Sequence, residues 1–217
     1  MNEQTRTIIH FIRHGDAIPD ATTPFSGSAG YDEMGLSEKG AAQAEALAAR
    51  LVRTLPIAAV YASPSRRAYE TAAIVAGAFA LGVVRDPRLR EIALGDESQP
   101  ADLSAEARAS AIRERLEALA AIALRDGSWA SVPGVESNAR VRSRVGEAVA
   151  HIVANHPNEH VAIVSHAGTI NAHLAALLGT ANDFFFPIGN TSLSSVRHVG
   201  ARALLLRLND TAHLERA

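Results

Sequence analysis

Short apolar runs along the chain predict the strands of a sheet. Residues 7–12 and 161–164 are nearly continuous apolar runs, rich in β-branched side chains, and they fit strands that are buried on both faces. Two such strands would form the centre of the sheet. The other predicted strands are 58–62, 83–85 and an antiparallel hairpin of 192–198 and 203–209 around Gly200.

Apolar residues at helical spacing predict helices between these strands. Ser37 is suited to cap a first helix, and Ser63-Pro64 indicates a second helix start, with the hydroxyl as the cap and proline at the first helical position. Two further helices, one around 112–123 and one beginning near Ser137, are expected to cover the sheet. A last helix is expected to end at Gly179.

The alternation of strands and helices predicts an α/β fold, a three-layer α/β/α sandwich with a mainly parallel central sheet. The chain of 217 residues shows no linker or internal repeat, so we expect one domain over 1–217. The segments 16–35 and 95–100 are polar and lack periodicity, which is typical of loops. Residues 95–136 are expected to form an insertion that caps a small-molecule pocket.

Composition excludes several classes of function. The formal net charge of −2 provides no general attraction for nucleic acid, and the absence of cysteine excludes disulfides, thiolate metal sites and a cysteine nucleophile. No apolar span approaches the length that crosses a membrane, and no long apolar segment follows the first residues. We therefore expect a cytoplasmic protein with no membrane or nucleic-acid partner.

Polar residues with phosphate chemistry follow two of the predicted strands. Arg13-His14-Gly15 follows the first strand and Ser165-His166 follows the strand at 161–164. Open α/β sheets bind ligands just outside the carboxyl ends of their strands. A neutral imidazole at His14 can attack phosphorus, and the guanidinium of Arg13 offers a planar fork of donors that matches phosphate oxygens.

Three motifs in order resemble the histidine phosphatase superfamily, also called phosphoglycerate mutase-like. They are Arg13-His14-Gly15 after the first strand, the stretch Ser63–Ala72 with Arg67-Ala68 and Thr71-Ala72, and Val164–Gly168 around the second histidine. Leu89-Arg90-Glu91-Ile92 matches the position of the family's acid. The resemblance covers nearly the whole chain.

The resemblance implies a role for each of these residues. His14 would take the phosphoryl group covalently, while Arg13, Arg67 and His166 bind the phosphate and His166 also stabilises the transferring group. Glu91 would protonate the leaving alcohol. The expected enzyme is a metal-independent phosphomonoesterase without a cofactor.

Four further residues are candidates for substrate binding. Gly15 permits a close approach of the backbone to a ligand, and Asp16 follows it in a stretch that resembles the start of a small subgroup of phosphohistidine phosphatases. Glu136 and Ser137 belong to Gly134-Val135-Glu136-Ser137, which resembles the family's Gly-Gly-Glu-Ser turn. A helix cap would explain Ser137 equally well.

The expected reaction is hydrolysis of small phosphorylated metabolites. The alternatives are a phosphoglycerate mutase, a protein phosphohistidine phosphatase, and a catalytically weak relative that binds phosphorylated ligands. Mutases of this family carry a Glu-Arg-His-Tyr-Gly type stretch after the acid, whereas 96–102 here holds three carboxylates that would repel a second anionic group. The oligomeric state stays open, with a homodimer as the candidate assembly.

Overall fold

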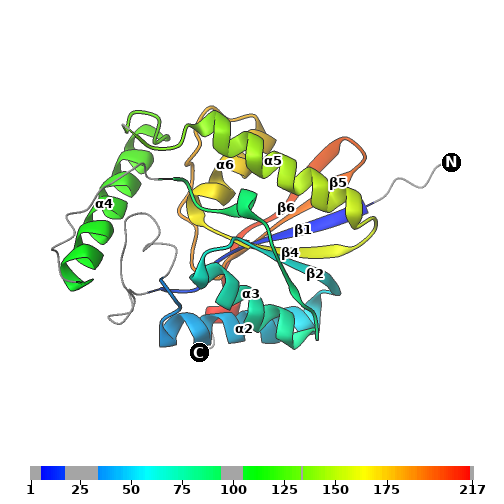
Figure 1. Ribbon diagram of the computed structural model, residues 1–217. Coiled ribbons are helices and arrows are strands. Elements are labelled where there is room, and N and C mark those ends of the chain that lie inside the picture. Colours follow the sequence, from blue (N-terminus) through cyan, green and yellow to red (C-terminus); the bar gives the residue numbers. More distant parts are fainter. Residues whose placement is uncertain (1–5, 18–33, 94–104, 133, 216–217) are drawn as a thin grey trace.

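The computed structural model describes residues 6–17, 34–93, 105–132 and 134–215. One six-stranded sheet forms its centre, in the order β3-β2-β4-β1-β5-β6 (Figure 1). Strands β3, β2, β4 and β1 are parallel, β5 pairs with β1 in antiparallel fashion, and β6 pairs antiparallel with β5, so the predicted mainly parallel α/β sheet is confirmed. The strands are β1 Arg6–Arg13, β2 Ile57–Ala62, β3 Val83–Arg85, β4 His160–Ser165, β5 Leu193–Val199 and β6 Arg202–Asp210.

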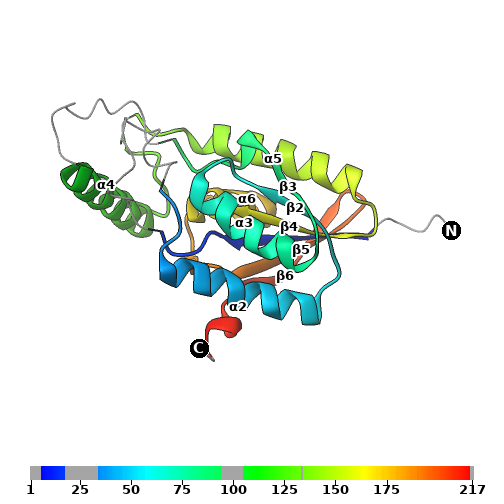
Figure 2. The ribbon, with the colours of Figure 1, turned by 60° about the horizontal axis from the view of Figure 1, so that its bottom comes forward.

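Helices cover the two faces of this sheet and complete three layers. Helices α2 and α3 lie on one face, and α5 and α6 lie on the other (Figures 1 and 2). The central strands are buried on both faces, because Ile12 packs toward α2 and α3 while Ile9 and Phe11 pack toward α5 and α6. The helices are α2 Glu38–Thr54, α3 Arg66–Ala78, α4 Ala105–Asp126, α5 Asn138–Asn155 and α6 Ala167–Leu178.

Most predicted boundaries agree with these elements. Ser37 caps α2 by accepting a hydrogen bond from the Gly40 N–H, and Gly179 ends α6 in the left-handed conformation. The predicted hairpin is present, with Gly200 in its turn at a φ of 55°. The predicted loop 16–35 lies mostly outside the described residues, but its ends meet where Ala17 bridges Leu36.

The prediction that α3 begins at Ser63-Pro64 is wrong. The helix begins at Arg66 after Ser65, and no serine side chain caps it. Ser63 continues the sheet instead, because its N–H donates to the carbonyl of Val164. Its hydroxyl lies 2.8 Å from Nε2 of His166. These tertiary contacts hold Ser63 at the end of the strand, and the helix therefore begins three residues later.

Only one of the two helices expected to cover the sheet does so. Helix α5 buries Val141, Val145 and Ile152 against it. Helix α4 stands away from both faces, beyond the carboxyl ends of β1 and β4 (Figures 1 and 2). Among the described side chains of α4 only Ala123 is buried, which explains why this helix makes no layer. No described helix is long and apolar enough to cross a membrane.

Candidate active site

Three neighbouring strands deliver the candidate residues to one edge of the sheet. His14 follows β1, His166 follows β4 and Ser63 follows β2, and β4 lies between the other two strands. The ring centroids of His14 and His166 are 5.1 Å apart, with the rings edge to face. The first turn of α3 adds Arg67, which is only 1% exposed. Residues from distant parts of the sequence thus meet in a buried site.

The imidazole of His14 is held in one orientation with one nitrogen available. Its Nδ1 lies 2.7 Å from the carbonyl oxygen of Gly15. Because that oxygen can only accept, Nδ1 carries the proton and Nε2 carries the lone pair. The Nε–H of Arg67 points at this Nε2 from 3.3 Å. The backbone is fixed as well, since the carbonyl of His14 accepts a hydrogen bond from the side chain of Asn190.

Arg67 connects the two histidines. Its Nε donates to His14, and its Nη2 lies 3.2 Å from Nδ1 of His166. Because a guanidinium only donates, Nδ1 of His166 accepts, and Nε2 carries the proton toward the hydroxyl of Ser63. The two lone pairs therefore face the guanidinium, which is the group best matched to the oxygens of a phosphate.

Both histidines are neutral in this arrangement. Burial lowers the pKa of His14 well below its ordinary value of 6.5, and the charges of Arg67 and Arg13 lower it further, although the Gly15 carbonyl opposes them. Burial also lowers the pKa of His166, and the charges of Arg67, Arg13 and Arg144 add to this effect. A neutral His14 retains the lone pair that a nucleophile needs.

Arg13 brings a second positive charge to the site. Its Nη1 donates to the carbonyl of Ile188, and its charge lies close enough to lower the pKa of both histidines. The backbone carbonyl of Arg13 accepts from the N–H of Thr191, which ties the end of β1 to the residues before β5. Arg13 and Arg67 together make the site attractive to an anion.

Glu91 lies against the beginning of α6, whose N-cap is His166. Its carboxylate accepts from the N–H groups of Gly168 (3.3 Å) and Thr169 (3.0 Å) and from the Thr169 hydroxyl. A Cβ at Gly168 would lie 2.9 Å from the carboxylate and 2.3 Å from the side chain of Ile92, so a larger residue here would displace these two side chains. The structure thus places Glu91 beside the helix start that carries His166.

A comparison with protein families agrees with this geometry. The model of the histidine phosphatase superfamily (branch 1) matches residues 9–211. The chain belongs to this superfamily. The predicted family and an enzyme with phosphatase activity are therefore confirmed, and phosphorylated small molecules are substrates that fit this family.

Individual histidine phosphatases resemble the chain over almost its whole length. Phosphoserine phosphatase 1 of Hydrogenobacter thermophilus is 31% identical over 94% of this chain and 92% of its own. A probable phosphoglycerate mutase of Erwinia tasmaniensis is 30% identical over 95% and 94%. The structure of YhfR from Bacillus stearothermophilus superposes with a TM-score of 0.75 at 29% identity, covering 96% of this chain and 99% of that one. The relatives thus include both phosphatases and a mutase.

Two of the predicted substrate-binding residues, Gly15 and Asp16, form the turn after His14 in this histidine phosphatase and connect it to neighbouring elements. The N–H of Gly15 donates to the hydroxyl of Thr71, and a Cβ at Gly15 would lie only 2.6 Å from the carbonyl oxygen of Gly40. The carboxylate of Asp16 accepts from the hydroxyl of Ser37 at 2.7 Å. These contacts press the turn against the beginning of α2 and so position His14.

The other two candidates, Glu136 and Ser137, lie at the start of α5. The carboxylate of Glu136 is occupied by an ion pair with Arg144 and by the N–H of Ala93. Ser137 caps α5, as the alternative prediction had it, by accepting from the N–H of Arg140. Within the described residues, neither side chain forms a hydrogen bond or ion pair with His14, Arg67 or His166.

Sequence reasoning missed several partners of the two histidines. Ser63 was assigned to a helix cap, although its position directly after a strand was a signal for the site. Thr71 and Asn190 hold the backbone around His14. Thr71 lies in a stretch that resembles the family, but its own role was not predicted. Arg144 carries no motif at all. Among the described residues, no cluster of three or more metal-ligating side chains occurs.

Proposed function

We propose that this histidine phosphatase hydrolyses phosphomonoesters of small metabolites through a phosphohistidine on Nε2 of His14. The observation that carries the proposal is the lone pair of a neutral His14 facing the guanidinium of Arg67. His14 attacks phosphorus as the bond to the leaving oxygen breaks, and the carboxyl group of Glu91 gives that oxygen a proton. Water then attacks the phosphorus as the bond to Nε2 of His14 breaks, and it gives a proton back to Glu91. Inorganic phosphate leaves and the enzyme returns to its starting state.

Arg67, Arg13 and His166 hold the phosphoryl group during these steps. When substrate binds, the guanidinium of Arg67 gives up its hydrogen bonds to the two imidazoles and donates to phosphate oxygens instead. These new hydrogen bonds are stronger, because donor and acceptor both carry a charge. A bound dianion also offsets the charges of the arginines, which add to burial in lowering the pKa of His166. In this proposal His166 takes up a proton from solvent and donates a hydrogen bond to the transferring group.

The reaction needs no metal ion in this proposal. The positive charge that other phosphatases take from cations is supplied here by Arg13 and Arg67, both of which influence the histidines electrostatically. The nitrogen atoms of His14 and His166 are engaged by Gly15, Arg67 and Ser63.

Residues 95–136 form, in this proposal, a cap over the site within a single domain of residues 1–217. The position of α4 beyond the carboxyl ends of β1 and β4 supports this assignment, because the candidate residues lie at the same ends (Figure 1). The three carboxylates of 96–102, on which the argument against a mutase rests, lie outside the described residues.

The leading alternative is a phosphoglycerate mutase, because one relative bears that name. The decisive experiment incubates the purified protein with 3-phosphoglycerate and the bisphosphoglycerate primer and follows 2-phosphoglycerate and free phosphate together. Phosphate release without isomerisation supports the hydrolase. Rapid isomerisation with little free phosphate overturns it. A parallel screen of phosphorylated metabolites begins with phosphoserine, the substrate that the name of another relative gives.

We also propose a cytoplasmic homodimer that forms through β6. This strand lies at the edge of the described sheet, and Leu204, Leu206 and Leu208 are 53%, 46% and 40% exposed along one face. Charged side chains usually protect an edge strand from pairing with another chain. In a two-fold symmetric dimer, the β6 strands of the two copies would lie antiparallel and bury each other's exposed leucines. Light scattering after gel filtration should give a dimer for the wild type and a monomer for Leu206→Glu. A monomeric wild type would refute the assembly.

A further inference from the structure

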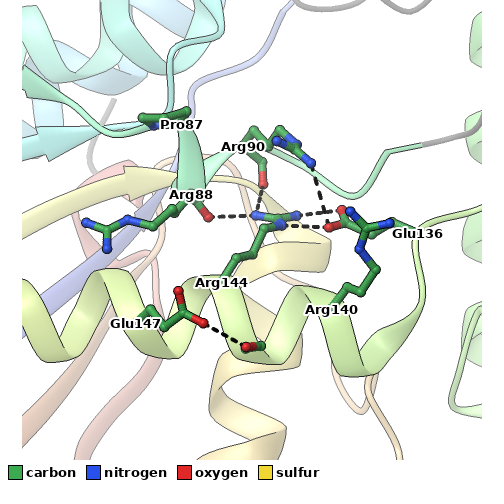
Figure 3. A pocket seen from close by; sticks show the side chains of 8 residues that line it. Pro87, Arg88, Arg90, Glu136, Arg140, Arg144 and Glu147 are labelled. Carbon is green, nitrogen blue, oxygen red and sulfur yellow. Dashed lines mark hydrogen bonds and ion pairs between the residues drawn. The ribbon is translucent and has the colours of Figure 1, made fainter.

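Arg144 connects the segment that carries Glu91 to Glu136. From α5, its Nη1 donates to the carbonyls of Arg88 (2.7 Å) and Arg90 (2.8 Å), and its Nη2 donates to the carbonyl of Glu91 (3.2 Å). Its Nε and Nη2 also bind the two carboxylate oxygens of Glu136, each at 2.9 Å. All five N–H groups of the guanidinium are therefore in use, as Figure 3 shows in part.

Glu136 completes the attachment of this segment. Its Oε2 accepts from the N–H of Ala93, and its own N–H donates to the carbonyl of Ala93 at 2.8 Å. The side chains of Glu136 and Arg144 are only 4% and 12% exposed, so the pair is shielded from solvent. The indole of Trp129 donates to the carbonyl of Glu136 and fixes the turn before α5.

The segment from Arg90 to Ala93 has no strand or helix to hold it. Its backbone is held by the carbonyl bonds to Arg144, by the two bonds between Ala93 and Glu136, and by the hydroxyl of Thr169, which donates to the carbonyl of Arg90. The side chain of Glu91 reaches the N–H groups at the start of α6. Thr169 thus anchors the segment from α6, and the ion pair of Arg144 and Glu136 anchors it from α5.

We propose that Arg144 and Glu136 are positioning residues that hold Glu91 for proton transfer to the leaving oxygen. The proposal rests on the acid role of Glu91 in the proposed function. Neither residue touches the reacting atoms. Their role is geometric, since a general acid must lie within hydrogen-bond reach of the oxygen it protonates.

This role predicts an effect that depends on the leaving group. Glycerol leaves as a strongly basic alkoxide and needs its proton, whereas 4-nitrophenolate leaves readily without one. Arg144→Lys keeps the positive charge near His166 but loses the planar fork. We expect kcat/KM for glycerol 2-phosphate to fall on the order of 10²-fold, the contribution typical of general acids. The value for 4-nitrophenyl phosphate should stay close to that of the wild type.

Arg142→Lys provides a matched control on the same helix. Arg142 also makes an ion pair with a buried carboxylate, that of Asp183, and a bond to the carbonyl of Thr180, but it does not contact the segment of Glu91. This variant should change neither substrate's kcat/KM. Glu136→Gln, which leaves the packing almost unchanged and weakens the hold on Arg144, should repeat the selective loss of Arg144→Lys.

Glu91→Gln separates a failure of this inference from a failure of the proposed function. A selective loss for glycerol 2-phosphate in Glu91→Gln, Arg144→Lys and Glu136→Gln supports positioning. The same loss in Glu91→Gln alone overturns the positioning role and leaves the acid in place. Equal losses on both substrates in Arg144→Lys and Glu136→Gln also overturn it, because they indicate general destabilisation. An unselective Glu91→Gln overturns the acid role itself.

Discussion

Two buried histidines on and just after β1 make an instructive comparison. His10 lies within the strand and contacts His160, with ring centroids 5.2 Å apart, while His14 follows the strand and contacts His166 at 5.1 Å. Burial lowers the pKa of His10 to about 3, with further contributions from His160 and Arg207, and it lowers the pKa of His14 as well. Burial and pKa therefore do not distinguish the two residues.

The partners of the ring nitrogens do distinguish them. Nδ1 of His10 bonds to the hydroxyl of Ser195 and its Nε2 to His160, so that neutral partners occupy both nitrogens. Nε2 of His14 faces the guanidinium of Arg67, a donor that an incoming phosphate can recruit. A buried histidine becomes a candidate nucleophile when its lone pair faces groups that attract the substrate.

The largest expected effect separates the two histidines by activity. His14→Ala should lower kcat for 4-nitrophenyl phosphate on the order of 10³-fold or more, because the covalent route is lost. His10→Gln should retain most of the wild-type rate, since His10 contacts Ser195 and His160 rather than the site. Circular dichroism of both variants checks that the fold persists. Comparable turnover by His14→Ala and wild type would contradict the nucleophile assignment.

A second comparison tests the arginine that faces His14. Arg67 is buried between the two histidines, whereas the neighbouring Arg66 is half exposed and pairs with Glu70 at 2.7 Å. Arg67→Lys should reduce kcat/KM on the order of 10²-fold, because lysine cannot present the fork that stabilises the developing charge. Arg66→Lys, the same change one residue earlier, should have little effect. Equal losses in the two variants would remove Arg67 from the phosphate site.

Sequence patterns located the centre of this site because the strands that carry it have a strong signal of their own. The apolar runs before His14 and Ser165-His166 predicted two central strands, which pair directly with each other. Parallel neighbours bring their carboxyl ends to the same edge, so the two histidines had to meet. Arg67 depended on the family motif, since a helix start by itself does not say which arginine points inward.

The remaining contacts depend on tertiary packing that leaves no local pattern. Arg144 reaches backbone carbonyls more than fifty residues away, and carbonyl groups carry no sequence signature. Ser63-Pro64 fits a helix cap equally well as a strand end, and the contact with His166 decides between them. The spacing of apolar residues around 112–123 predicted a helix but did not reveal what this helix packs against.

A smaller effect concerns stability at acid pH. His10 and His173, whose pKa burial lowers to about 3 and about 4, stay neutral in the folded protein while the unfolded chain protonates near 6.5. Their neutral forms thus contribute stability that is complete above pH 6.5 and is lost as the pH falls toward 4. Each of these two histidines lowers the free energy of unfolding by about 1.4 kcal/mol for every unit by which the pH falls in that window. Urea denaturation between pH 7.5 and 4.5 measures this slope.

His10→Gln isolates one of the two contributions. The variant should lower the pH dependence of the unfolding free energy by about 1.4 kcal/mol per pH unit, which corresponds to one proton. This change in slope is independent of the variant's absolute stability. The matching measurement on His173→Gln should give a similar reduction, since His173 is likewise buried and neutral. An unchanged slope in His10→Gln would mean that this histidine protonates without unfolding.

The smallest expected effect is that of chelation. Thorough dialysis against EDTA should leave kcat for 4-nitrophenyl phosphate unchanged, because the charges proposed to bind the phosphate are those of Arg13 and Arg67, which do not ligate metals. A loss of activity that Mg²⁺ or Zn²⁺ restores would contradict metal independence. The comparison of the two histidine pairs then locates the ion. If the metal effect disappears in His10→Gln, it arises at the pair of His10 and His160, and if it persists, it arises elsewhere in the protein.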